Sequence, residues 1–407
     1  MQRYGISASA ISSYEHSYHG RAFLHFGQTK SATCTDCHGA HSILAPNNAG
    51  HTCTKCHHKT KNKLAAPGVS HLALRINDSP LLKIERLFFK TLTLTIMLCL
   101  AMMITFDLYG RLFRRSPSHK TCRLIAILIA LGFYCLVGGI AIAAFNLRAA
   151  QHLCIVWAIM TASAYIIHKL RQPSAVKKRS DRYYTRFNLA QRAQHILLAG
   201  SFTLLVITGM PLRYADISWT HHFNTLFGGF QGARIAHRVG AIILIITWIW
   251  HCIDLIFRWK QTGFSLKSWS MWPNRKDITD LIHTIQYNLS LQPERPHYDR
   301  FHFRQKFDYL AVCWGMPIMV ASGLVLWFPA AAGSLLPSIA QPVAWIAHSD
   351  EALLAMLAIV VWHLYNVHLN PDNFPSNQSW LTGKLSESEM EREHPLEKAR
   401  IDAKHGV

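Results

Sequence analysis

Seven apolar stretches, each close to the length needed to cross a bilayer, constrain the fold of this 407-residue chain more than any other feature. A transmembrane helix needs about 20 consecutive apolar residues. Half of the residues are apolar and only 16% are charged, which is typical of a polytopic membrane protein. We therefore predict an all-α membrane protein with about seven transmembrane helices, at residues 87–109, 122–146, 150–169, 194–213, 237–258, 308–328 and 345–369.

The basic residues of the connecting segments predict the orientation of the chain in the membrane. The formal net charge is +20, but Lys and Arg flank the apolar stretches and do not form one stripe, so we expect no nucleic-acid partner. Basic residues are frequent after the first, third and fifth stretches and scarce in the other loops. By the positive-inside rule, residues 1–85 lie outside the cytoplasm and the C-terminus lies inside, as in a multi-pass protein of the bacterial inner membrane.

Two C-x-x-C-H strings in the N-terminal segment indicate covalently attached haem. They are Cys34-Thr-Asp-Cys37-His38 and Cys53-Thr-Lys-Cys56-His57. In this motif two thiols add to the haem vinyl groups and the His becomes an axial iron ligand. The spacing between the two strings also fits a four-thiolate zinc ribbon, but a ribbon does not need a His after each pair. We predict two c haems in a small periplasmic domain over residues 1–85.

The distal ligands and the export of this domain are less constrained. His19 and His71 lie in strings that resemble distal-ligand sequences of multihaem cytochromes, and His41 and His51 compete with them. Residues 1–33 contain no apolar signal-peptide core. We expect that a longer N-terminal part precedes residue 1 or that the first transmembrane helix exports the domain.

Histidines within the apolar stretches are functional candidates, because ionisable side chains at membrane depth are costly. His237 and His348 lie near the outer ends of their stretches, whereas His195, His251 and His363 lie near the inner ends. Spacings of 14 and 15 residues on one helix correspond to about 21–22 Å and to nearly the same face. This pattern predicts two bis-His b haems in a four-helix bundle over residues 183–378. The alternative is a set of polar, helix-packing histidines, and periodicity does not choose between His251 and His363.

From about residue 183 to 378 the chain resembles the membrane cytochrome b subunit of formate dehydrogenase and its thiosulfate and hydrogenase relatives. The strings that carry the resemblance are Arg186-Phe-Asn-Leu-Ala-Gln191-Arg-Ala-Gln-His195, Ile207-Thr-Gly209-Met-Pro211, Ala236-His237-Arg-Val-Gly240, Lys306-Phe-Asp-Tyr309, Ser322-Gly-Leu-Val-Leu-Trp327-Phe-Pro329 and Trp362-His363-Leu-Tyr365.

The resemblance implies ligand pairs and an overall architecture. It implies that His195 and His363 hold an inner haem, that His237 and His348 hold an outer one, and that His251 and His368 have no firm role. Three preceding helices, at residues 86–170, and the c-type domain make the whole similar to fused c/b-type quinone oxidoreductases of the inner membrane. We expect residues 379–407 to form a solvated cytoplasmic tail with a short surface helix.

The expected function is electron transfer between menaquinone or ubiquinone and a periplasmic cytochrome or oxidoreductase subunit. The chain would be a quinol:cytochrome-type oxidoreductase or the electron-transfer subunit of one. The alternative is a membrane anchor that passes electrons from a periplasmic dehydrogenase to quinone. We see no hydrolase triad, phosphate loop or nucleotide fingerprint. His251 and Asp254 are candidates for a quinone site beside the inner haem. The alternative is that Asp254 pairs with Arg258 one turn on.

Overall fold

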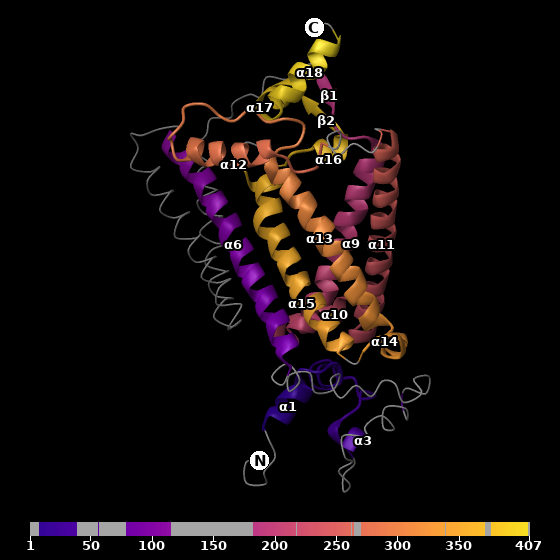
Figure 1. Cartoon of the computed structure of the whole chain (residues 1–407). Coiled ribbons are helices and arrows are strands. Elements are labelled where there is room, and N and C mark those ends of the chain that lie inside the picture. The colour runs from indigo at the N-terminus through magenta and orange to yellow at the C-terminus, as the bar shows by residue number, and fades with distance from the viewer. Residues whose placement is uncertain are drawn as a thin grey trace. The chain divides into compact units, whose positions relative to one another are not determined.

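The computed structural model describes residues 8–38, 56, 79–114, 182–216, 218–261, 263, 270–337, 339–370 and 376–405. The described residues are mainly helical (Figure 1), and five helical segments among them are long and apolar enough to cross a membrane. They are α6 (Pro80–Arg114), α9 (Leu189–Arg213), α11 (Phe230–Gln261), α13 (Phe303–Trp327) and the segment that begins with α15 (Ala340–Ala358). The all-α membrane class is confirmed. The expected stretches 122–146 and 150–169 lie outside the described residues.

Shorter elements connect and flank these helices. They are α1 (Ala8–Glu15), α2 (Tyr18–Gly20), η2 (Arg21–His25), α3 (Cys34–His38), β1 (Tyr183–Thr185), α10 (Ser218–Leu226), α12 (Arg275–Asn288), α14 (Pro329–Leu335), η6 (Ile359–His363), η7 (Tyr365–Leu369), α16 (Ser379–Thr382), β2 (Lys384–Ser386), α17 (Glu387–Glu393) and α18 (Pro395–His405). The elements labelled η are single π-helical turns.

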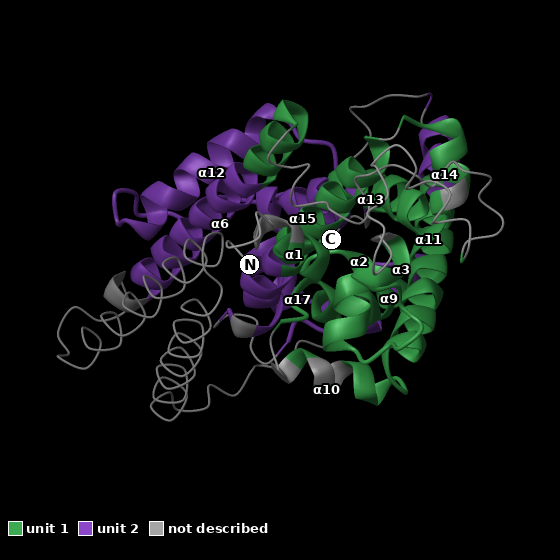
Figure 2. Ribbon diagram, turned by 90° about the horizontal axis from the view of Figure 1, so that it is seen from below, with its two compact units in different colours: residues 1–89, 196–252, 314–356 green, residues 90–195, 253–313, 357–407 purple. Residues whose placement is uncertain are grey.

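The chain divides into two compact units (Figure 2), and the long helices contribute residues to both. Unit 1 comprises residues 1–89, 196–252 and 314–356, and unit 2 comprises residues 90–195, 253–313 and 357–407.

In unit 1 the N-terminal segment contacts the ends of the long helices. The Arg21 guanidinium donates a hydrogen bond to the backbone oxygen of Leu212 at 2.8 Å and lies over the ring of Trp345. Phe26 stacks on Phe230 at the start of α11, with ring centroids 5.0 Å apart. Because burial in this contact strips water from the guanidinium, the pKa of Arg21 falls to about 10.

Unit 2 contains the beginning of α9 and a folded C-terminal segment. Asn188 and Gln191 exchange hydrogen bonds between side chains and backbone N–H groups at 2.8 and 3.1 Å, a capping box that fixes where α9 begins. The strands β1 and β2 pair antiparallel, so Tyr184 faces Leu385, and both pack against Met390 of α17.

The C-terminal segment is not the solvated tail that the sequence suggested. Glu397 of α18 is 5% exposed and forms an ion pair with Arg186, just before α9, and with Arg300. His394 is 3% exposed, and its Nδ1 donates to the backbone oxygen of Asp299 at 2.8 Å. We call residues 376–405, with the segment 289–302 against which they pack, the cap.

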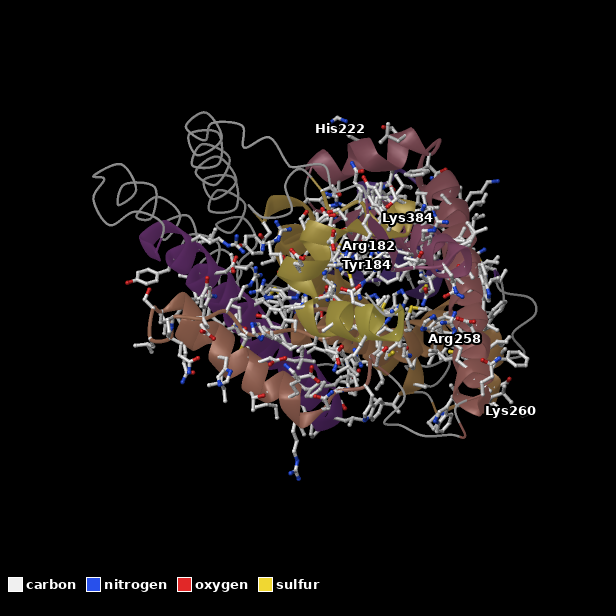
Figure 3. The ribbon with its side chains drawn as sticks, turned by 90° about the horizontal axis from the view of Figure 1, so that it is seen from above. Arg182, Tyr184, His222, Arg258, Lys260 and Lys384 are labelled. Carbon is white, nitrogen blue, oxygen red and sulfur yellow. The ribbon has the colours of Figure 1, made fainter. Side chains whose placement is uncertain are left out.

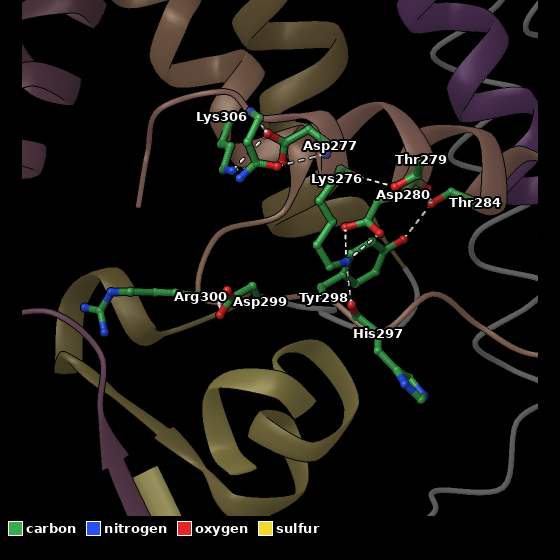
Figure 4. A network of polar contacts seen from close by, with 11 residues as sticks. Lys276, Asp277, Thr279, Asp280, Thr284, His297, Tyr298, Asp299, Arg300 and Lys306 are labelled. Carbon is green, nitrogen blue, oxygen red and sulfur yellow. Dashed lines mark hydrogen bonds and ion pairs between the residues drawn. The ribbon is translucent and has the colours of Figure 1, made fainter. Parts of the chain in front are cut away.

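Helix α12 lies in the segment 259–307, between the fifth and sixth apolar stretches of the sequence. Asn274 and Asp277 form its capping box. Lys276 bonds both carboxylate oxygens of Asp280 at 2.6 and 2.7 Å and the backbone oxygen of His297 at 2.9 Å (Figure 4). Thr284 and Tyr298 share a hydrogen bond of 2.7 Å. These contacts join α12 to the segment 289–302 of the cap.

Candidate functional site

The first candidate site, in unit 1, lies between α11 and α15. The imidazoles of His237 and His348 face each other with ring centroids 6.4 Å apart and planes inclined at 65°. We call this pair the outer site. Two histidines from different helices at this separation leave room for one metal centre between them.

Each outer-site histidine is held by a hydroxyl group of a neighbouring helix. Thr208 of α9 lies 2.8 Å from Nδ1 of His237, and its own hydroxyl donates to the backbone oxygen of Leu204 at 2.7 Å. Ser322 of α13 lies 3.1 Å from Nδ1 of His348 and donates to the backbone oxygen of Ile318 at 2.5 Å. Because each hydroxyl hydrogen is already used, Nδ1 is the donor and Nε2 keeps its lone pair for a metal.

Each hydroxyl residue is followed by a glycine that makes space for the ring. A Cβ at Gly209 would lie 3.1 Å from Cε1 of His237, and a Cβ at Gly323 would lie 3.2 Å from Cε1 of His348. The pairs Thr208-Gly209 and Ser322-Gly323 therefore do the same work on two helices. One residue orients the imidazole, and the next lets it approach the helix.

The second candidate site, in unit 2, lies between the beginning of α9 and the π-helical turn η6. The rings of His195 and His363 are also 6.4 Å apart, with planes inclined at 39°. Nδ1 of His363 lies 3.0 Å from a carboxylate oxygen of Asp308 on α13, so it donates and Nε2 remains available. Nδ1 of His195 is buried and has no hydrogen-bond partner among the described residues. We call this pair the inner site.

Both sites fit haem iron. Two imidazoles on opposite sides of a metal, each at about 2 Å, place their ring centres about 6 Å apart. The described residues contain no group of three or more His, Cys, Asp or Glu that would complete a protein-only metal site. A porphyrin supplies four iron ligands itself, so two histidines are sufficient. The buried Nδ1 of His195, which has no hydrogen-bond partner among the described residues, is unusual because most buried polar atoms have one.

The comparison with known proteins points to the same class of molecule. The chain is similar to the cytochrome b556 subunit of formate dehydrogenase from Escherichia coli. The identity is 23% over 183 residues, which cover 44% of this chain and 76% of the relative, in each of three strains. No model of a known protein family matches the chain. The similarity supports a cytochrome b-like membrane subunit with a role in electron transfer and with haem b as cofactor.

Sequence reasoning missed the partners of these histidines, although they lie in the strings that resemble the cytochrome b subunits. Thr208 and Ser322 each precede a glycine at a similar distance before an outer-site histidine, 29 and 26 residues, and Asp308 lies in the Lys306–Tyr309 string. The repeated hydroxyl–glycine pair was the available signal. Periodicity alone does not show which helices face each other.

The two quinone candidates, His251 and Asp254, both lie on α11. Asp254 pairs with Arg258 at 3.0 Å, one turn further along α11, which is the structural alternative that the sequence left open. The role of both residues in quinone binding stays a prediction.

The N-terminal motif is described in part. Cys34 and Cys37 lie on α3, with Cys34 exposed and Cys37 partly buried, and Cys56 is exposed. His19 is half-buried, and its backbone oxygen accepts a hydrogen bond from Ser31 at 3.1 Å. Cys53, His57, His71 and the side chain of His38 lie outside the described residues. Haem c therefore stays a prediction.

A buried ionic cluster ties α6 to the neighbourhood of the inner site. Asp107 of α6 is 5% exposed and pairs with Arg111 at 2.8 Å. It also contacts Arg304 of α13 at 3.5 Å and accepts a hydrogen bond of 2.6 Å from Tyr365. Tyr365 follows His363 by two residues, so α6 supports the segment that carries this inner-site histidine.

Proposed function

We propose that this chain transfers electrons between a quinone in the membrane and a protein outside the cytoplasm. The outer and inner sites would each hold one haem b, and the two C-x-x-C-H motifs would each hold one haem c. The observation that carries the proposal is the equal 6.4 Å ring separation in two histidine pairs, three of whose four rings have an Nδ1 partner.

When bound, haem supplies reversible one-electron chemistry at iron. The side chains of this protein supply position and electrostatics. Thr208, Ser322 and Asp308 hold their histidines in one tautomer, and the carboxylate of Asp308 makes its imidazole a more basic ligand than a hydroxyl would. The two b sites would therefore have different reduction potentials, which favours flow in one direction.

We assign the inner site to the cytoplasmic side. Basic residues that the positive-inside rule places in the cytoplasm belong to unit 2, which contains that site. Figure 3 labels four such basic residues: Arg182, which directly precedes β1, Lys384 of β2, and Arg258 and Lys260 in the last turns of α11. Menaquinol or ubiquinol would be oxidised beside His195 and His363, with His251 and Asp254 as candidate groups for quinone binding and proton release.

The comparison with known proteins supports a second candidate function. The protein that this chain resembles is named as a subunit of formate dehydrogenase, and the match covers 76% of that subunit. The chain would then be the membrane anchor of a periplasmic dehydrogenase and would pass electrons to quinone. The potentials of the haems relative to quinone distinguish the two directions, because electrons flow spontaneously toward the higher potential.

The proposal is tested by counting haems in the purified full-length chain with the pyridine-haemochrome assay. We expect two extractable b haems and two covalent c haems. His363→Ala and His237→Ala should each lose one haem b, whereas His251→Ala and the control His222→Ala, which changes an exposed histidine, should keep both. Stoichiometric zinc without covalent haem would overturn the c-type assignment, and loss of a haem in His251→Ala alone would overturn the inner pair.

A further inference from the structure

Glu351 is a buried carboxyl group in a membrane-spanning helix that neither histidine pair uses. The residue is 3% exposed, and its Oε2 atom is buried with no hydrogen-bond partner among the described residues. Buried ionisable groups at membrane depth are costly and are usually retained for a function. A buried carboxyl oxygen without a hydrogen-bond partner is unusual, because most buried polar atoms have one.

The facing helix is shaped around this carboxyl group. Gly315 of α13 lies against it, and a Cβ at this position would lie 2.8 Å from Oε1 of Glu351. Glycine inside a helix costs about 1 kcal/mol relative to alanine. Gly315 therefore lowers the intrinsic stability of α13 at the position where the carboxyl group of Glu351 needs space.

Glu351 lies close to the outer site along α15. It follows His348 by three residues, which corresponds to a rise of about 4.5 Å and to the same helix face. Both side chains are directed to α13, where Ser322 and Gly323 meet His348 and Gly315 meets Glu351. The neighbouring acid Asp350 is already held by Arg213 at 2.7 Å.

This placement makes the charge of Glu351 sensitive to the charge of its surroundings. Burial disfavours the unpaired carboxylate relative to the neutral acid. The positive charge that an oxidised haem would place nearby favours the carboxylate, because opposite charges interact strongly where the dielectric constant is low, and an added electron removes that positive charge. Addition of an electron at the outer site should therefore be accompanied by uptake of a proton at Glu351.

We propose that Glu351 binds one proton when the haem b of the outer site is reduced and releases it when that haem is oxidised. The inference rests on the proposed function, which supplies the haem and the quinol that donates the electron. One electron converts iron(III) to iron(II), and one proton from water converts the carboxylate of Glu351 to the acid, so the net charge of the site does not change.

The test is a spectroelectrochemical titration of the purified full-length chain with redox mediators at several pH values. One proton per electron lowers the midpoint potential of the outer haem by up to 59 mV for each tenfold fall in proton concentration. In Glu351→Gln this pH dependence should disappear, while the titration of the inner haem should be unchanged from the wild type. The control Glu294→Gln, which neutralises an exposed carboxylate, should behave as the wild type.

An unchanged pH dependence in Glu351→Gln would overturn the inference. If that variant fails to bind haem, the reduced-minus-oxidised infrared difference spectra of the wild type and of Gly315→Ala decide. A protonated-carboxyl signal that shifts in Gly315→Ala supports the inference, and the absence of such a signal in the wild type overturns it. A wild-type protein without haem b would instead overturn the proposed function, so the two failures are distinguishable.

Discussion

The outer site depends on pairs of small residues that do two different tasks. Thr208 and Ser322 fix the tautomers of His237 and His348, and the glycines that follow them let the rings approach their helices. Neither role can be recognised from the hydropathy of the sequence, because Thr, Ser and Gly all occur in apolar helices. The ring positions are set by steric contact as much as by hydrogen bonds.

Substitution of Gly209 tests this steric contribution. Gly209→Ala places a methyl group 3.1 Å from Cε1 of His237, so the ring must move by a few tenths of an ångström. We expect the outer haem to be lost or its absorbance band to shift, with a destabilisation of about 1–3 kcal/mol from overpacking. Gly200→Ala on the same helix is the matched control, because nothing lies within 4 Å of its added methyl group. Equal haem spectra in both variants would contradict this account.

The hydrogen-bond partners of the histidines allow the two sites to be perturbed separately. Asp308→Asn keeps an acceptor for Nδ1 of His363 but removes the negative charge, so this imidazole becomes a weaker donor to iron. We expect the midpoint potential of the inner haem to rise, and iron affinity to fall by about 10–100-fold. Ser322→Ala should instead change the outer haem alone. A redox titration of both variants checks this, and a shift of the same haem in both would be incompatible with it.

At the residue scale the sequence indicated the candidate histidines better than the contacts of each one. Position along the apolar stretches put His237 and His348 near outer ends and His195, His251 and His363 near inner ends. The resemblance implied the pairs His195/His363 and His237/His348, and the rings of each pair lie 6.4 Å apart. Asp308 lies 55 residues before His363, and no local pattern connects the two. Glu351 was missed for the same reason, since its burial depends on Gly315 of another helix.

At the scale of elements, the segment from α15 to η7 is the most informative. Its π-helical turns η6 and η7 follow directly after regular helix and carry His363 and Tyr365. Each π-helical turn inserts one residue relative to the α-helical register and is common at functional sites. A strict helical period read from the sequence therefore loses accuracy just before His363. This is one physical reason why periodicity did not choose between His251 and His363.

The cap shows a different limit of sequence reasoning. The charged C-terminal residues were correctly expected to include a helix, and α17 begins at a capping box formed by Ser386 and Glu389. Their burial was not expected. The ion pair of Glu397 with Arg186 joins residues 211 positions apart, so its existence depends on the tertiary fold.

The cap should lose stability on acidification. Burial, together with the nearby Arg186 guanidinium, lowers the pKa of His394 from 6.5 to about 4 in the folded protein. The unfolded chain therefore binds more protons between these values, and the stabilisation present above pH 6.5 is lost as the pH falls toward 4. The shift corresponds to about 3 kcal/mol.

Hydrogen exchange of residues 376–405 at pH 7 and pH 5 measures this effect. We expect smaller protection factors at the lower pH, where a protection factor is the intrinsic exchange rate at that pH divided by the observed rate. The difference between the two pH values should be smaller in His394→Gln, because the new side chain does not titrate in this range. Some pH dependence should remain in this variant because of His302, whose ring stacks on that of His394 in the wild type with centroids 6.0 Å apart. The pKa of this buried histidine is also lowered, by burial and by Arg304. Equal protection factors at both pH values in the wild type would show that the cap does not depend on neutral histidines.

At the scale of the whole molecule, the distribution of charge and the predicted attachment of haem c require the same orientation. Covalent attachment through C-x-x-C-H requires the N-terminal segment to leave the cytoplasm. The loop 329–344 contains no basic residue, whereas the segment 259–307 contains several. Positive charge near helix ends resists transfer across the membrane, so the basic segment should remain in the cytoplasm.

Two exposed positions test this orientation by cysteine labelling in intact cells. Ser334 lies on α14 within the loop 329–344, and Glu294 lies in the segment between α12 and α13. Ser334→Cys should react with a membrane-impermeant maleimide from outside, and Glu294→Cys should react only after lysis, each measured against the parent chain and its native cysteines. The reverse pattern would place the inner site and the cap outside the cytoplasm. It would also put the basic segments on the side to which their transfer is most costly, so this single experiment tests both the charge argument and the assignment of the inner site to the cytoplasmic side.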